Sequence, residues 1–225
     1  MYLIEALPAP VDPNILEVLI EAEPATIGHF ITHGIPHPEI KAHLQNVRAV
    51  GTAVTVRMPG NDGGILHYAM GCVRPGDFLV VDRCGERITA ALGGAMAYAA
   101  KQAGVAGIIV DGYVTDLGEL REHGVPVWSR GASAITTRVI GLDGEFCTPI
   151  HCGGVVVRAG DAVVADENGI VFLPPEQMLG LAQRAIDFQR NEKQTLARLA
   201  KGEKFPDIVG SRATIEAATR PVIPR

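Results

Sequence analysis

Aromatic residues are scarce in this chain: they make up only 5% of its 225 residues, whereas 47% are hydrophobic. Cysteine is also rare, and the four cysteines form no CxxC pair, which argues against a zinc site and a disulfide framework. No apolar run reaches the roughly 18 residues that a transmembrane helix needs. The N-terminal segment lacks a basic region and is interrupted by prolines, so no signal peptide is expected. These absences predict a cytoplasmic protein that has no membrane partner.

Positive charge is in deficit as well, with 20 Lys and Arg against 25 Asp and Glu and a net charge of -5. Nucleic-acid binding needs clustered positive charge, so nucleic acid is not an expected partner. The length suits one large domain or two small ones, and a chain of this size can bury about 70% of its unfolded surface. A sizeable core is therefore expected without disulfides.

The hydrophobic pattern predicts that strands dominate the middle of the chain and that helices flank them. This arrangement is typical of the α/β class with a mixed sheet. The expected strands are 50–56, 78–82, 105–110, 126–128, 155–158, 162–165 and 170–173. The expected helices are 11–23, 25–33, 67–72, 88–103, 116–122 and 176–199.

The segment from Gly93 to Asp116 is the best candidate for a functional site. Gly93 and Gly94 interrupt the helical period of 88–103, and the true helix could begin there. The amides of Ala95 and Met96 would then be free to bind a carboxylate or phosphate. The alternative is that the two glycines let the helix approach a strand closely, and the local pattern favours that alternative.

Asp111 and Asp116 follow a buried strand, at the edge where ligands collect in open α/β sheets. A lone carboxylate with waters in the other positions suits Mg²⁺ or Mn²⁺. Asp116 could instead be the N-cap of the helix that follows, and Asp111 with Gly112 could form a turn. Arg130 could contact an anion or form a salt bridge. Taken singly, these residues favour the structural alternatives.

Five co-linear segments of the chain resemble one protein family. They are GTAVTVRMPG (51–60), RPGDFLVVD (74–82), LGGAMAYAAKQAGVAGIIVDGYVTD (92–116), GVPVWSRG (124–131) and AGDAVVADENGIVFLP (159–174). The family is the class II pyruvate aldolases of the 4-hydroxy-4-methyl-2-oxoglutarate and 4-carboxy-4-hydroxy-2-oxoadipate type, which also includes RraA-like regulators of ribonuclease E. The resemblance implies a swivelling β/β/α fold in three layers, in homotrimers or hexamers with active sites between subunits.

The resemblance also implies site residues. The family's first motif falls on Gly93, Gly94, Ala95 and Met96, whose amides would bind the pyruvyl group. Its second motif, Asp-Gly-x-x-Arg-Asp, falls on 111–116, and its last Asp, here Asp116, would anchor Mg²⁺ or Mn²⁺ among waters. The chain departs from the family at two positions. Gly94 stands where an acid is usual, and Thr115 stands where the family has the arginine that holds the substrate.

The expected protein is thus a single RraA-like domain over 1–225, with a core at about 51–174 and a C-terminal helix at 176–199. Its expected function is a divalent-metal-dependent lyase acting on a small 2-oxo acid. Asp116 and Thr115 would be catalytic, Asp116 would hold the metal, and 93–96 with Thr115 would bind substrate. The alternatives are altered chemistry on another oxo or hydroxy acid, and a non-catalytic regulator of a ribonuclease.

Overall fold

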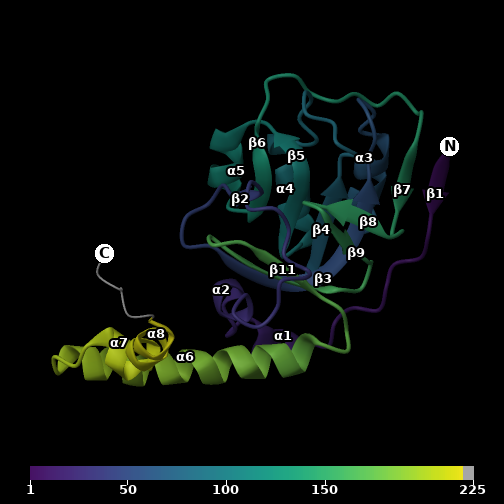
Figure 1. Cartoon of the computed structure of the whole chain (residues 1–225). Helices are drawn as coiled ribbons and strands as arrows, with labels where there is room; N and C mark the ends of the chain where they lie inside the picture. Colours follow the sequence, from purple (N-terminus) through teal and green to yellow (C-terminus); the bar gives the residue numbers. More distant parts are fainter. Residues whose placement is uncertain (220–225) are drawn as a thin grey trace.

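A mixed β-sheet organises the computed structural model, which describes residues 1–219 (Figure 1). Four neighbouring strands run parallel, and further strands extend the sheet on both sides. Along the sheet the order is β1 (Tyr2–Ile4), β7 (Gly144–Phe146), β3 (Arg48–Arg57), β4 (Asp77–Asp82), β5 (Gly107–Val114), β6 (Val127–Ala132) and β2 (Lys41–Ala42). A hairpin of β10 (Ala162–Asp166) and β11 (Ile170–Leu173) pairs with β3 through β10, and β8 (Ile150–Cys152) and β9 (Val155–Val157) form a separate hairpin.

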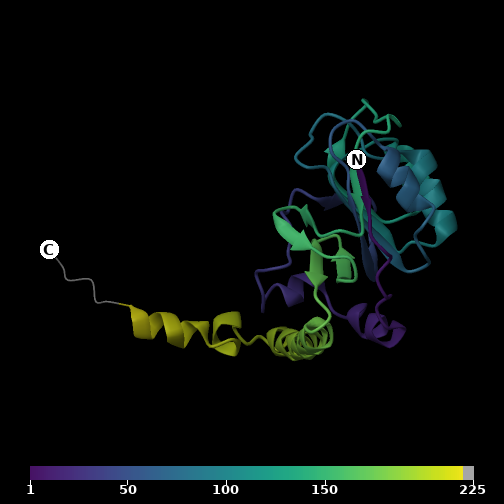
Figure 2. The same cartoon turned by 90° about the vertical axis from the view of Figure 1, so that its right-hand side faces the viewer.

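Helices lie on both sides of this framework (Figures 1 and 2). One group packs on the central parallel strands: α3 (Gly64–Met70), α4 (Gly94–Ala103) and α5 (Leu117–His123). The other packs against β10 and β11: α1 (Pro13–Leu19), α2 (Pro24–Ile27) and α6 (Met178–Ala200). Beyond α6 come α7 (Phe205–Ile208) and α8 (Ser211–Ala218). Within residues 1–219, no helix is both long and apolar enough to cross a membrane.

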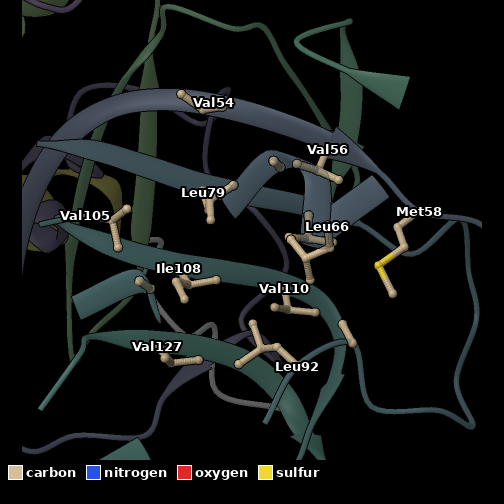
Figure 3. Close-up of a cluster of buried hydrophobic side chains, with 14 of the residues drawn as sticks. Val54, Val56, Met58, Leu66, Leu79, Leu92, Val105, Ile108, Val110 and Val127 are labelled. Carbon is tan, nitrogen blue, oxygen red and sulfur yellow. The ribbon is translucent and has the colours of Figure 1, made fainter. Parts of the chain in front are cut away.

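The core forms on both faces of the central strands because β4 contains the unbroken apolar run Phe-Leu-Val-Val and β5 contains Ile-Ile-Val, whose side chains alternate between the two faces. On one face, side chains such as Leu79, Ile108 and Val127 meet α3, α4 and α5 (Figure 3). On the other face, Phe78, Ile109 and Trp128 meet the β8–β9 hairpin. Helices, sheet and hairpin thus form three layers, and the expected α/β class with a mixed sheet and flanking helices is confirmed.

The structure corrects several expected boundaries; the helix expected over 25–33, for example, ends at Ile27. Two of the corrections lie beside the candidate site. The helix expected over 88–103 begins only at Gly94, because residues 90–92 run beside β5 instead. There the amide of Ala91 donates to the carbonyl of Tyr113, and the amide of Thr115 donates to that of Leu92. These bonds also extend the neighbouring strand. It was expected over 105–110, and in the structure it runs from Gly107 to Val114. Periodic small residues fit an extended segment as well as a helix, so the sequence pattern overestimated the helix.

Candidate functional site

The candidate site lies where β5 ends and α4 begins. Asp116 immediately follows Thr115 at the end of β5 and precedes α5. Its backbone is left-handed, with φ 55° and ψ 42°, a conformation that Asp and Asn accept more readily than other residues with a side chain. This sharp turn directs the carboxylate of Asp116 back toward the start of α4, where it accepts a 3.0 Å hydrogen bond from the amide of Gly94.

The capping role considered for Asp116 is therefore wrong for its side chain. Asp116 occupies the N-cap position of α5, but its carboxylate accepts no hydrogen bond from that helix. It bridges to α4 instead and also lies 3.3 Å from the hydroxyl of Thr115. The structure thus brings together Asp116, Thr115 and Gly94, three of the residues that the sequence nominated.

Gly93 and Gly94 leave room for two carboxylates. A Cβ atom on Gly93 would overlap the carboxylate of Asp116, and one on Gly94 would overlap that of Glu119 on α5. Glu119 was not nominated from the sequence. Its position over Gly94 depends on how α4 docks against α5, which no local pattern reveals. The carboxylate of Glu119 thus occupies the space that an acidic side chain at position 94 would fill.

The first turn of α4 offers hydrogen-bond donors beside these acids. In residues 1–219, the amides of Ala95 and Met96 have no hydrogen-bond partner. The aligned peptide dipoles of α4 add partial positive charge at this end, and the first turn of α4 itself contains no acidic residue. Both readings of the two glycines therefore apply, since α4 begins there and also packs closely against neighbouring side chains.

Three arginines from other parts of the chain, Arg83, Arg87 and Arg130, all hold other partners. Arg83 is fully buried and donates to the carbonyls of 58 and 60 and to the side chains of 86 and 89. Arg130 binds Asp111, and Arg87 lies 3.7 Å from the same carboxylate. The neutral hydroxyl of Thr115 is therefore the side chain that this chain offers where the family has arginine.

Asp111 belongs to β5 and does not form the turn that its neighbour Gly112 indicated. Its carboxylate accepts from the guanidinium of Arg130 at 2.5 Å and from the amide of Gly153 at 2.7 Å. Gly153 follows β8, so Asp111 faces the β8–β9 hairpin and not α4. Asp111 therefore links the β8–β9 hairpin to the sheet. Of the two roles considered for Arg130, the structure shows the salt bridge.

The donor set at Asp116 fits a hydrated hard cation. Within residues 1–219, no three His, Cys, Asp or Glu side chains come together in a way that would hold a metal ion. A chelating zinc or calcium cage is thus missing from the described part of the chain. Mg²⁺, however, keeps several waters and binds through one or two carboxylates, which Asp116 and its neighbour Glu119 can supply.

Comparisons with known proteins place the chain in a family. The family model described as RraA-like, Aldolase/RraA, matches residues 19–172. A 4-hydroxy-4-methyl-2-oxoglutarate aldolase from Thermus thermophilus is 31% identical over 156 residues, which cover 69% of this chain and 94% of the relative. A Halalkalibacterium halodurans protein named "Putative 4-hydroxy-4-methyl-2-oxoglutarate aldolase" is 32% identical over 154 residues, 68% of this chain and 73% of the relative.

A solved structure agrees with these relatives. It is that of Streptomyces coelicolor RraAS2, described as an unusual member of the RNase ES inhibitor RraA protein family. It superposes with a TM-score of 0.74 at 29% identity and covers 82% of this chain and 96% of the other. Sequence and structure comparisons thus agree, and the chain belongs to the Aldolase/RraA family.

Proposed function

We propose that the chain is a divalent-metal-dependent lyase that cleaves or decarboxylates a 2-oxo acid. The observation that carries this proposal is the meeting of Asp116 with the amide end of α4. An acid that can hold a hydrated cation lies there beside the unpartnered amides of Ala95 and Met96, which can bind a carboxylate. Relatives named as 4-hydroxy-4-methyl-2-oxoglutarate aldolases support the same chemistry.

Each residue of the site has a separate task in this proposal. The amides of Ala95 and Met96 bind the substrate carboxylate, helped by the dipole of α4. Asp116 would hold Mg²⁺ or Mn²⁺, with Glu119 adding negative charge nearby. When bound, such an ion polarises the keto oxygen of the substrate and stabilises the enolate that follows bond cleavage. Thr115 contributes one hydroxyl that can donate to the substrate.

A direct assay tests the proposal. We expect purified protein to release pyruvate from 4-hydroxy-4-methyl-2-oxoglutarate or from oxaloacetate when Mg²⁺ is present. Activity should disappear in EDTA and return when Mg²⁺ is added in excess, because the enolate charge requires the metal. Absence of pyruvate from both substrates, with the metal bound, would overturn the lyase proposal.

A second candidate function is the binding of a ribonuclease without catalysis. The observation that favours it is Thr115, whose neutral hydroxyl stands where the family has the arginine that holds the substrate. RraAS2 is described as belonging to a family of ribonuclease inhibitors, which supports this alternative. The assay above separates the two, because a regulator of this kind needs no turnover.

Thr115→Arg should raise the lyase activity. A guanidinium beside the start of α4 would add a charged, bidentate contact to the substrate carboxylate. A charged hydrogen bond is worth about 1.5–3 kcal/mol, so kcat/KM should rise by roughly tenfold to a hundredfold. Steady-state assays of pyruvate release measure the change. Thr115→Gln is the matched control, because it adds length without charge, and an equal gain in that variant would contradict the electrostatic argument.

Gly94→Glu should destabilise the protein unless Glu119 is also removed. The new side chain would collide with Glu119, and overpacking of this kind costs about 1–3 kcal/mol in the free energy of unfolding. The double variant Gly94→Glu with Glu119→Ala should recover most of that loss, because one acid then replaces the other. Urea denaturation of the four members of this cycle measures the coupling between the two positions.

Mn²⁺ affinity in the same four proteins tests whether Glu119 takes the place of an acid at position 94. We expect weaker Mn²⁺ binding in Glu119→Ala and restored binding in the double variant. Glu122→Ala on the same helix is the control, and it should bind Mn²⁺ as the unaltered chain does. Independent effects of the two substitutions would show that Glu119 and position 94 do not share one space.

A further inference from the structure

A separate cavity of about 530 Å³ opens at the carboxyl edge of the sheet, on the face away from α4. It is lined by Glu39, Lys41, Arg87, Tyr113 and Arg130. Three of these five residues are cationic and one carries a phenol. Its floor is β5 and β6, with Lys41 contributed by the short edge strand β2. The sheet separates this cavity from the start of α4, because Arg130 and its partner Asp111 face the β8–β9 hairpin.

Arg130 is the fixed element of the cavity. Its side chain is only 10% exposed, and its Nε donates to Asp111 while one terminal nitrogen donates to Glu39 at 2.6 Å. Both oxygens of Asp111 are occupied, one by Arg130 and the other by the amide of Gly153. The guanidinium is thus held rigidly at the cavity wall, and the nearest negative charges are already compensated.

The remaining donors of the cavity have few partners of their own. In residues 1–219, the ammonium of Lys41 and the hydroxyl of Tyr113 make no hydrogen bond, and Arg87 makes only a 3.7 Å ion pair with Asp111. Lys41, Tyr113 and Arg87 therefore supply three hydrogen-bond donors to the cavity, beside the guanidinium of Arg130. Glu39 is the one acid in the lining, and its side chain is 67% exposed, so it can turn toward solvent.

We propose that this cavity binds a small organic anion through a phosphate or carboxylate group. Arg87 and Arg130 present planar guanidinium groups that match the oxygens of either anion, while Lys41 supplies a point charge. The phenol of Tyr113 adds a neutral donor. This proposal is independent of the lyase proposal, because the cavity shares no residue with the site formed by Ala95, Met96, Thr115, Asp116 and Glu119.

Calorimetric titration of the whole chain with inorganic phosphate and with malonate tests the proposal. We expect saturable binding of at least one probe, weakened by added NaCl because part of the site is open to solvent. Saturation by phosphate alone identifies a phosphorylated ligand, and saturation by malonate alone identifies a dicarboxylate. If both probes saturate, the site binds oxyanions without selecting between them. Each of these outcomes supports the site.

Variants assign the binding to this cavity. Arg87→Gln and Lys41→Gln should each weaken binding by about tenfold or more, because each loses a charged donor. Lys101→Gln, an exposed lysine on α4, is the matched control and should bind the probe as before. Neither position is buried, so thermal unfolding of the variants should match that of the unaltered chain. Failure of both probes to saturate, or unchanged affinity in Arg87→Gln, would overturn the proposal.

Discussion

Replacing Asp116 by asparagine should abolish metal-dependent turnover and leave the fold intact. Asn accepts the left-handed backbone of this position, and its amide oxygen can still accept the hydrogen bond from Gly94. The substitution therefore removes the negative charge and little else. Mutation of a residue that only orients a metal ligand typically lowers metal affinity or activity by about tenfold to a hundredfold. Loss of the ligand's own charge should therefore lower kcat by more than about a hundredfold.

Two measurements separate the charge of Asp116 from its structural contact. Mn²⁺ titration should show weakened binding in Asp116→Asn, while the midpoint of thermal unfolding stays unchanged. Asp116→Ala should lose metal binding too, but it should also unfold more easily because it loses the bond to Gly94 and the tolerance for positive φ. Asp187→Asn on α6 serves as the control. Full turnover in Asp116→Asn would remove this residue from the proposed mechanism.

The largest loss of stability should follow from a residue outside the site, Asp62. Its side chain is 2% exposed and accepts hydrogen bonds from the amides of Gly64, Ile140 and Leu142 and from the hydroxyl of Tyr2. These donors belong to β1, to the start of α3 and to the loop before β7. Asp62 therefore joins three segments that are distant in the sequence.

Asp62→Ala should lower the free energy of unfolding by at least about 3 kcal/mol. A hydrogen bond to a charged group contributes about 1.5–3 kcal/mol, and this substitution removes four such bonds to the carboxylate. Urea denaturation at neutral pH measures the loss. Asp143→Ala, at an exposed carboxylate of the same loop, is the control and should change stability little. A loss below 1 kcal/mol would mean that solvent satisfies these donors.

Stability should also depend on pH through Asp62. Burial alone raises the pKa of this carboxyl, but the hydrogen bonds from the three amides and Tyr2 outweigh it and hold the pKa well below its usual value. A carboxyl with a lowered folded-state pKa stabilises the protein above its unfolded-state pKa, about 3.9, and loses that contribution as the pH falls further. The stability difference between the unaltered chain and Asp62→Asn should thus shrink below about pH 4. A difference that stays constant down to pH 3 would contradict this assignment.

The central strands could be predicted because their own sequences determine them. In the strand expected over 78–82, residues 78–81 are continuously apolar and two of these four are β-branched valines, a composition that favours a buried strand. The partners of Asp62 could not be predicted in the same way. It sits in a glycine-rich loop that indicates only a turn, while its donors lie up to 80 residues away. Strands of two or three residues, such as β1 and β2, were missed because their pairing depends on neighbours that are distant in the sequence.

The candidate site was predicted in part. Asp116 and the two glycines were nominated by the motifs, and the structure places them in contact. Glu119 was missed because it acts from a neighbouring helix, although the absence of an acid at position 94 was a signal to look for one elsewhere. The cationic cavity around Arg130 was missed for a related reason, since Lys41 and Arg87 reach it from a strand and a loop that are distant in the sequence.

The chain's mass is unevenly distributed: α6 runs below the sheet (Figure 1), and the yellow segment beyond it, which holds α7 and α8, projects away from the body (Figure 2). Only the first half of α6 has buried residues, the last of them Ala185. Its 23 residues span roughly 35 Å, so its far end lies roughly 22 Å along the helix beyond the last buried residue, Ala185. X-ray scattering from the isolated chain would therefore give a pair-distance distribution with a long tail. A subunit whose terminal helices fold back onto another surface would lose that tail, so the profile reports directly on where Phe205 and Ile215 lie in solution.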